Sequence, residues 1–361
     1  MKNKLYLFSD SIIRRKEKTI MLEKVMKSDE ARDEDDDQME EMRREEYLLS
    51  EDELMPTGES KYIPIESIDA IYSFGALRFN SRLIYFLSQY QIPLHIFNYY
   101  GGYSGSFYPA GHEVAGSILI SQVLIFRNQM MRLKVAKEFV FAAISNGIAN
   151  LRYYQNRGSE LNETIAGMEE LKEATAKADT IAEIMGYEGM AKRIYYSSWK
   201  EIFAYPVGFT TRVKHPPDNL INALISYGNA IVYSVCLDEI YRTRLYPEIG
   251  FLHEPADGKL SLSYDIAEIF KPLITDRVIF KVINKNMISE KEALIKNSRC
   301  ILKKSAKEVF VSEIEGKLNT MIEITGREKR MSYRRIIREE CYNLLKLITE
   351  NQEYKAYKSK W

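Results

Sequence analysis

The sequence contains few cysteines, and their placement excludes two classes of protein. Cys236, Cys300 and Cys341 are the only three among 361 residues, and they stand far apart. Their odd number and wide spacing form neither a disulfide framework nor the close pairs of a zinc motif. We therefore expect reduced thiols and a cytoplasmic protein.

Long apolar runs and one familiar nucleotide-binding loop are also absent. No run approaches the roughly 20 apolar residues that a membrane-spanning helix needs. The first residues, MKNKLYLFSDSIIRRK, alternate polar and apolar side chains without the core of a signal peptide. The pattern GxxxxGK[ST] of phosphate-binding loops does not occur. We expect a soluble intracellular protein with no membrane partner and no nucleotide-hydrolysing loop.

The balanced net charge hides two regions of opposite sign. The chain has 51 basic and 51 acidic residues, but residues 29–53 contain 14 acidic and 3 basic ones, a balance of −11. The remaining chain therefore carries +11, and residues 271–361 supply +9 of it from 21 basic and 12 acidic residues. Such an excess is typical of proteins that bind polyanions, although solvated helix faces also produce it.

The hydrophobic pattern changes from strand-like to helical along the chain. Short runs rich in β-branched and aromatic residues predict strands early in the sequence, as in LYLFS, TIMLEKV and IDAIYSF, whereas helical periodicity dominates after GGYSGSFYP. We predict an α+β protein with a small β-rich N-terminal domain, residues 1–103. A larger all-helical domain, residues 104–361, carries the candidate site. The acidic segment interrupts the first domain and is predicted to be a disordered loop rather than a charged helix.

Glu188 lies on the apolar face of a predicted helix. Apolar side chains recur at helical spacing between residues 181 and 199, and Glu188 falls on the same stripe. A carboxylate that faces a core is costly unless a cation or several donors satisfy it. Gly186 and Gly189 beside it would let another backbone or a phosphate come close. Glu188 is therefore predicted to be a metal ligand, with an ion pair to Arg or Lys as the alternative.

A second group of candidate ligands follows later in the chain. Asp265 and Glu268 are three residues apart, so in a helix both project from one face and could hold one ion. His253 precedes this helix by a turn with Pro255 and Gly258, which can fold the imidazole back over the carboxylates. One imidazole, three carboxylates and no thiolate suit Mg²⁺ or Mn²⁺ better than Zn²⁺.

Four blocks of the sequence carry a family resemblance. They are FNYYGGYSGSFYP (97–109), GYEGMAKRIYY (186–196), KHPPDNLINALISYG (214–228) and IGFLHEPADGKLSLSYDIAEIFKPLITDR (249–277). They resemble the integrase family of CRISPR adaptation, the first-numbered CRISPR-associated protein. The resemblance extends from Lys4 to about Asn284. The family's metal-binding positions fall on Glu188, His253 and Glu268, and Asp265 matches a neighbouring acid that the family often carries.

The resemblance implies a function and partners. The chain would be a metal-dependent DNA endonuclease and integrase with catalytic residues Glu188, His253 and Glu268. It would insert new spacers into a CRISPR array, in the adaptation stage of antiviral defence, by attack of a 3′-hydroxyl on a phosphodiester. It would use Mg²⁺ or Mn²⁺, act as a homodimer on spacer precursor duplex and CRISPR repeat, and assemble with a small ferredoxin-like partner subunit. Relative to the family, residues 26–60 are an insertion in a hairpin connection.

Two other functions remain open at this point. One is a related integrase of a casposon-type mobile element, which acts without the small partner. The other is a non-catalytic DNA-binding scaffold whose acidic residues only cap helices or pair with Arg193. Lys192 and Arg193 follow Glu188 on the same predicted helix, so in either integrase we expect them to contact DNA phosphates.

Overall fold

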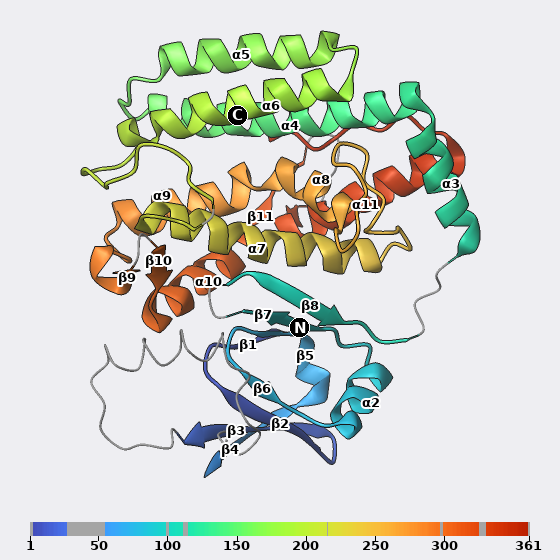
Figure 1. Cartoon of the computed structure of the whole chain (residues 1–361), viewed down its shortest axis with the longest axis vertical. Coiled ribbons are helices and arrows are strands. Elements are labelled where there is room, and N and C mark those ends of the chain that lie inside the picture. The colour runs from blue at the N-terminus through green and yellow to red at the C-terminus, as the bar shows by residue number, and fades with distance from the viewer. Residues whose placement is uncertain are drawn as a thin grey trace. The chain divides into compact units, whose positions relative to one another are not determined.

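The chain divides into two compact units, Met1–Gly111 and His112–Trp361. The computed structural model describes residues 3–26, 55–98, 101–110, 115–214, 216–296, 299–324 and 330–359. The first unit is rich in strands and the second in helices (Figure 1). The predicted α+β class, with a β-rich part followed by a helical part, is confirmed. The acidic segment at 29–53 lies outside the described residues, so the prediction of its disorder stays a prediction.

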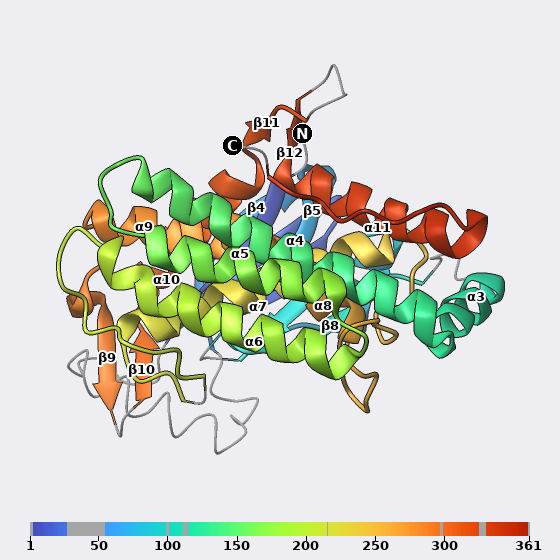
Figure 2. The ribbon, with the colours of Figure 1, turned by 90° about the horizontal axis from the view of Figure 1, so that it is seen from above.

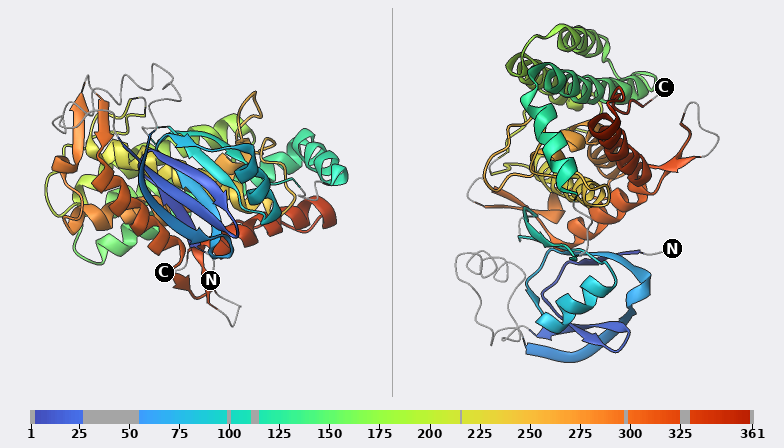
Figure 3. Two further views of the ribbon diagram at one scale, coloured as in Figure 1. Left: turned by 90° about the horizontal axis from the view of Figure 1, so that it is seen from below. Right: turned by 90° about the vertical axis from the view of Figure 1, so that its right-hand side faces the viewer.

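The described part of the first unit contains two four-stranded sheets. Its strands are β1 (Asn3–Leu7), β2 (Ser11–Lys16), β3 (Thr19–Met26), β4 (Met55–Pro64), β5 (Ile68–Ser73), β6 (Leu77–Arg78), β7 (Leu94–Phe97) and β8 (Tyr103–Phe107). One sheet has the order β1-β5-β7-β8, in which only β8 is antiparallel to its neighbour. The other has the order β4-β3-β2-β6, in which only β6 is parallel to its neighbour, and its blue strands are seen face-on in Figure 3 (left).

A single hydrophobic core joins these sheets to helix α2 (Ser81–Gln89). The helix begins where the side chain of Asn80 accepts the backbone N–H of Leu83, which satisfies one of the free donors of its first turn. Its apolar face buries Leu83, Phe86 and Leu87. The core side chains share an aliphatic or aromatic character and come from both sheets and the helix: Leu7, Ile13, Ile20, Ile65, Ile68, Ile71, Leu83, Phe86, Leu87, Ile92 and Leu94.

Two predicted boundaries in this unit shift in the structure. Residues 55–60, which the sequence assigned to the acidic insertion, form the first part of β4 and pair with β3. The antiparallel pairing runs from Thr19↔Pro64 to Met26↔Met55, so the acidic segment joins two paired strands. The division between the units falls after Gly111 rather than after residue 103, because β8 hydrogen-bonds to β7 and extends the first sheet.

The second unit is built mainly from helices. They are α3 (Gly116–Arg127), α4 (Gln129–Gln155), α5 (Asn162–Lys177), α6 (Ile181–Ser197), α7 (Leu220–Tyr241), α8 (Ser261–Phe270), α9 (Arg277–Asn284), α10 (Lys304–Leu318) and α11 (Tyr333–Glu350). Helices α4, α5 and α6 pack side by side, α8 packs between α4 and α7, and α11 packs against α7 and α3 (Figure 2). The unit is not all-helical as predicted, because β9 (Ala293–Lys296) pairs with β10 (Arg299–Leu302) and β11 (Met321–Ile322) with β12 (Met331–Ser332).

Helix α7 is the central helix of this unit. Within the described residues it is the one helix long and apolar enough to cross a membrane, with a mean hydropathy of 1.5 over its most apolar window. The sequence analysis expected no apolar run of this length, and that expectation was wrong for α7. Yet 83% of that window is buried inside the protein, as in the core helix of a helical domain.

A π-helical turn, Pro272–Asp276, links α8 to α9. Proline has no N–H to continue the helical ladder, so a break at Pro272 leaves carbonyl groups without helical partners. Two asparagines of α4 donate to backbone carbonyls next to this break: Asn146 Nδ2 donates to Ile269 O at 2.9 Å, and Asn150 Nδ2 donates to Pro272 O at 2.5 Å. Both asparagine side chains are fully buried. This pairing fixes the end of α8 against α4.

Candidate active site

Helix α6 holds Glu188 at the edge of the helical core. The helix begins where the Thr180 hydroxyl accepts the backbone N–H of Glu183 at 3.2 Å. Its inward face buries Ile184, Ala191 and Tyr195, and the Glu188 side chain on the same side is 18% exposed. Glu188 therefore lies on the apolar side of the helix, as predicted. It stands where that side meets the solvent.

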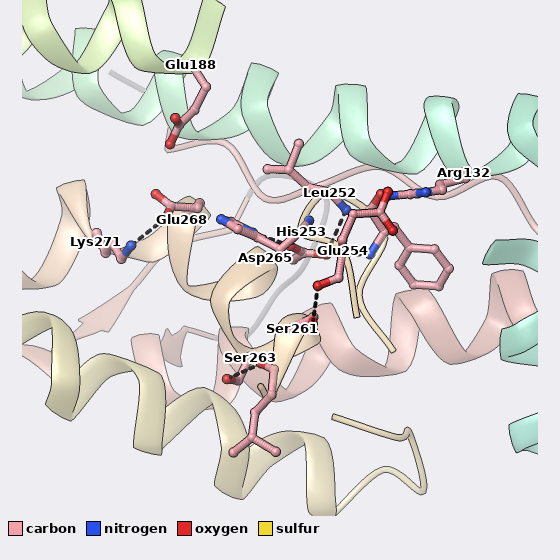
Figure 4. Close-up of polar contacts among 12 residues, drawn as sticks. Arg132, Glu188, Leu252, His253, Glu254, Ser261, Ser263, Asp265, Glu268 and Lys271 are labelled. Atoms are coloured by element: carbon pink, nitrogen blue, oxygen red, sulfur yellow. Dashed lines mark hydrogen bonds and ion pairs between the residues drawn. The ribbon is translucent and has the colours of Figure 1, made fainter. Parts of the chain in front are cut away.

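Glu268 faces Glu188 from helix α8. Its side chain is only 4% exposed, because α8 lies between α4 and α7. Figure 4 shows the side chains of Glu188, Glu268 and His253 directed toward one common region. Glu188 and Glu268 are 80 residues apart in the sequence, and the packing of their two helices brings the carboxylates together.

Two lysines neutralise these carboxylates. Lys192 Nζ forms ion pairs with Glu188 Oε1 and, at 2.8 Å, with Glu268 Oε2, so one ammonium group bridges the two helices. Lys271 Nζ lies 2.5 Å from the other oxygen, Glu268 Oε1 (Figure 4). The Lys271 ammonium also stands 4.6 Å from the ring centroid of Tyr233, whose π face is a favourable neighbour for a cation.

The charges of this cluster depend on one another. Burial by itself would raise the pKa of Glu268, but Lys192 and Lys271 outweigh it and hold this pKa well below its ordinary value. Burial would lower the pKa of Lys192, but Glu268 and then Glu188 raise it well above its ordinary value. The same balance between burial and Glu268 raises the pKa of Lys271. Removing any one charge leaves a buried partner uncompensated.

Asp265 positions His253 rather than facing the glutamates. Its Oδ1 lies 2.7 Å from His253 Nδ1 and accepts the backbone N–H of His253 at 3.0 Å. Its Oδ2 accepts the backbone N–H groups of Phe251 at 2.6 Å and Leu252 at 2.9 Å. Both oxygens of this fully buried carboxylate are therefore occupied. Asp265 was predicted as a possible metal ligand, and the structure instead has it binding the loop before α8.

Arg132 and Ser261 also hold the loop that carries His253. Arg132 of α4 donates through Nε to Phe251 O at 2.8 Å and through Nη2 to Glu254 Oε1 at 2.7 Å (Figure 4). The Ser261 hydroxyl donates to Glu254 O at 3.1 Å. Burial lowers the pKa of His253, but the hydrogen bond and charge of Asp265 raise it above its ordinary value. The imidazole is thus held in one orientation, and within the described part of the chain its Nε2 makes no hydrogen bond.

The donor set fits a divalent cation, although the predicted ligands do not form a closed cluster. Among the described residues, no three Asp, Glu, His or Cys side chains lie close enough together to hold a metal ion. Glu188 and Glu268 nevertheless share one cation, the Lys192 ammonium, and so mark a position where positive charge binds. His253 is oriented by a carboxylate through Nδ1, the usual arrangement of a metal-binding imidazole. Oxygen and imidazole ligands suit Mg²⁺ and Mn²⁺.

The two predicted DNA-contacting residues differ in the structure. Lys192 points into the cluster and bridges the glutamates, whereas Arg193 is exposed. Sequence analysis missed Lys271, whose spacing of three from Glu268 on one helix face was the available signal. It also missed Lys214, an exposed lysine whose pKa is lowered by burial and then by the ammonium groups of Lys192 and Lys271.

Known proteins match the chain over its full length. A model of the family CRISPR associated protein Cas1 matches residues 35–316. A protein of Fusobacterium nucleatum named CRISPR-associated endonuclease Cas1 is 37% identical, with 100% of this chain and 98% of the relative covered. The solved structure of a Cas1 protein from Thermotoga maritima is 30% identical and has a TM-score of 0.78, with 99% of this chain and 100% of the other covered.

A casposase bound to its integration product shares the fold. Its TM-score is 0.81 over 99% of this chain and 95% of the other, at 20% identity. Taken together, the fold and the matches define a two-unit CRISPR-associated protein whose relatives are named endonucleases. The chain belongs to the Cas1 family. The family resemblance predicted from the sequence is confirmed.

Proposed function

We propose that the chain is a divalent-metal-dependent DNA endonuclease and integrase that inserts new spacers into a CRISPR array. The reaction is transesterification, in which a 3′-hydroxyl attacks a phosphodiester at the array. One observation carries the proposal: Glu188 and Glu268, on separate helices, converge on a single cation beside an imidazole that Asp265 orients. Nuclease and integrase chemistry needs concentrated positive charge at a phosphodiester, and this cluster provides a place for it.

Glu188, Glu268 and His253 Nε2 would hold Mg²⁺ or Mn²⁺. The bound ion would supply Lewis acidity toward the phosphoryl oxygen and stabilise the charge that develops there. The protein's own part is positioning. Asp265 holds the Nδ1 proton of His253, and Lys271 fixes one oxygen of Glu268, so both side chains keep their orientation. Arg193 and Lys214 offer positive charge for DNA phosphates at the rim of the site.

A CRISPR function is favoured over a casposon-type one by sequence. The relative named CRISPR-associated endonuclease Cas1 shares 37% of residues across the whole chain, whereas the casposase shares 20% and supports the fold alone. The family relationship supports a homodimer and assembly with a small ferredoxin-like partner subunit. The substrates would be spacer precursor duplex and the CRISPR repeat.

A non-catalytic scaffold is the less economical alternative. A scaffold would not require carboxylates in a buried position, where each costs free energy unless it is compensated. Here two glutamates and two lysines are arranged around one point at the edge of the core. Perturbed ionisable groups of this kind are concentrated at functional sites.

The proposal is tested by strand transfer of purified full-length protein with its partner subunit. The substrates are a short duplex with 3′-hydroxyls and a supercoiled plasmid that carries one repeat, in Mg²⁺, Mn²⁺ or EDTA. Glu188→Gln and Glu268→Gln should each lower the rate by about a hundredfold or more, because a lost ligand costs at least as much as a lost ligand-orienting group. Glu170→Gln, an exposed carboxylate on α5, is the matched control.

Three outcomes contradict the proposal or part of it. Transfer that continues at the same rate in EDTA would rule out metal dependence. Near-normal rates for Glu188→Gln and Glu268→Gln would remove these residues from the active site. Integration that needs no partner subunit and joins the ends of an inverted repeat would favour the casposon-type reaction instead.

A further inference from the structure

Lys192 occupies the place where the two glutamates meet. Its ammonium group pairs with Glu188 on its own helix and lies 2.8 Å from Glu268 Oε2 on α8. Lys271 already compensates the other oxygen of Glu268. Lys192 is therefore the cation that neutralises Glu188 and holds α6 to α8 at this point.

A second cation between these carboxylates would repel the ammonium group. Two positive charges a few ångströms apart in a partly buried site are strongly unfavourable, since the dielectric screening is weaker there than in water. Lys271 has 8% of its side chain exposed and is enclosed with Glu268, whereas the Lys192 side chain is 34% exposed. Its long flexible stem can carry the ammonium group outward without a change in the helix. Lys192 is thus the lysine free to leave.

The outward position lies beside other positive charge. Arg193 follows Lys192 on α6 and is exposed, and Lys214 is exposed as well; burial of its stem and then the ammonium groups of Lys192 and Lys271 lower the pKa of Lys214. These three side chains carry like charges, and an anion relieves their repulsion. A DNA phosphodiester is an anion of the right size, and lysine binds phosphate as a compact point charge.

We propose that Lys192 couples metal binding to DNA binding. Its ammonium group bridges Glu188 and Glu268 when no metal is bound, and it is released to a DNA phosphate when a divalent cation takes that position. The coupling rests on the proposed function, because it requires these two glutamates to be metal ligands. The coupling is reciprocal. If the metal raises the affinity for DNA by some factor, then bound DNA raises the affinity for the metal by the same factor.

Lys192→Met tests the coupling, because methionine keeps an apolar stem and a similar helix propensity while it removes the charge. Mn²⁺ affinity is measured by titration calorimetry on the full chain. DNA affinity is measured with a duplex that lacks 3′-hydroxyls, with and without Mn²⁺. The variant should bind Mn²⁺ about tenfold more tightly, because its competitor is gone. The gain in DNA affinity on adding Mn²⁺ should be smaller for the variant than for the wild type.

Two further variants and one further measurement complete the design. Lys200→Met is the control. Lys200 is exposed, and among the described residues its one ion pair is to Glu201 at 3.7 Å. This variant should leave the Mn²⁺ affinity and the gain in DNA affinity on adding Mn²⁺ unchanged. In EDTA, Lys192→Met should melt at a lower temperature than the wild type, because Glu188 and Glu268 lose their shared cation, and Mn²⁺ should raise its melting temperature more. If it does not fold in EDTA, Lys192→Arg keeps the charge and should fold and retain the competition.

The outcomes separate this coupling from the proposed function. If the wild type binds Mn²⁺ through Glu188 and Glu268 while Lys192→Met binds it equally or more weakly, the coupling is overturned and the proposed function stands. If only Lys192→Met binds Mn²⁺, the competition is supported directly. If Mn²⁺ binding is unaffected by Glu188→Gln and Glu268→Gln, or no protein binds Mn²⁺, both proposals fall.

Discussion

The Nδ1 atom of His253 and the Oδ1 atom of Asp265 lie 2.7 Å apart, and the same oxygen accepts the backbone N–H of His253 at 3.0 Å. A carboxylate can only accept here, so Nδ1 carries a proton and Nε2 of the neutral ring is an acceptor. With Phe251 and Leu252 donating to the second oxygen, one side chain of α8 sets both the path of the loop and the orientation of the imidazole. Asp265 is therefore a positioning residue.

Replacing Asp265 by Ala should destabilise the helical unit as well as inactivate it. The change leaves the buried backbone N–H groups of Phe251 and Leu252 and the half-buried one of His253 without an acceptor, and each buried group costs about 1–3 kcal/mol. We expect the free energy of unfolding to fall by about 3 kcal/mol or more, measured by denaturant titration. Asp257→Ala, in the exposed turn of the same loop, is the control and should change little. Unchanged stability for Asp265→Ala would mean that these hydrogen bonds are not formed.

Gly250 is a second support of the same loop. A Cβ atom at this position would lie 2.7 Å from Asp265 Oδ2 and 2.8 Å from Ser261 Cβ. Gly250→Ala should therefore displace the carboxylate and lower both stability, by about 1–3 kcal/mol, and strand transfer. Gly316→Ala is the opposite case, because a Cβ there meets no atom within 4 Å on helix α10. It should be neutral or stabilising by up to about 1 kcal/mol, and equal effects of the two changes would contradict the packing argument.

The buried carboxyl of Glu340 predicts a pH dependence of stability. Burial raises its pKa to about 7, although the Tyr354 hydroxyl and the backbone N–H of Tyr357 donate to it. Between the ordinary pKa of a glutamate in the unfolded chain and about pH 7, Glu340 is therefore protonated in the folded state and ionised in the unfolded state. The contribution of Glu340 to stability should be greatest below that ordinary pKa and should fall as the pH rises to about 7, by at most about 3 kcal/mol.

Glu340→Gln should remove this contribution. Amide and protonated carboxyl are similar in shape, and the amide does not titrate. The difference in unfolding free energy between the variant and the wild type should grow from pH 5 to pH 8, as followed by chemical denaturation. The exposed control Glu170→Gln should show no such trend. A constant difference across this range would place the pKa of Glu340 elsewhere.

The acidic segment should weaken DNA binding without taking part in chemistry. Residues 29–53 carry −11. Met26 and Met55 are directly paired, so an Asn-Gly turn can replace residues 27–54 in the β3–β4 hairpin. The shortened protein should bind nonspecific duplex more tightly at low salt, and its affinity should fall more steeply with salt, by a slope near −0.9 for each added phosphate contact. Superimposable binding curves at two salt concentrations would eliminate this screening effect.

Much of the architecture follows from local patterns. The early strands were predicted because β-branched and aromatic residues stand there in short runs, and LYLFS, TIMLEKV and IDAIYSF fall on β1, β3 and β5. The helical second unit was predicted from helical periodicity. The short sheets β9–β10 and β11–β12 were not, because a pairing of four or fewer residues leaves little periodic signal. The extent of the insertion also depended on tertiary pairing, since 55–60 reads as a strand only beside β3.

The sequence by itself determined the candidate residues of the site: Glu188, His253 and Glu268 stand in motifs, and chemistry limits what carboxylates and an imidazole can bind. Only the tertiary structure decided how each is used. Lys192 was predicted to contact DNA, yet its ammonium group lies between two helices whose approach no local pattern encodes. Asp265 was predicted beside Glu268 because they share a helix face, but its oxygens are taken by the loop before the helix. Ion pairs and buried hydrogen bonds form between segments distant in the chain, so their partners are settled only when the helices pack.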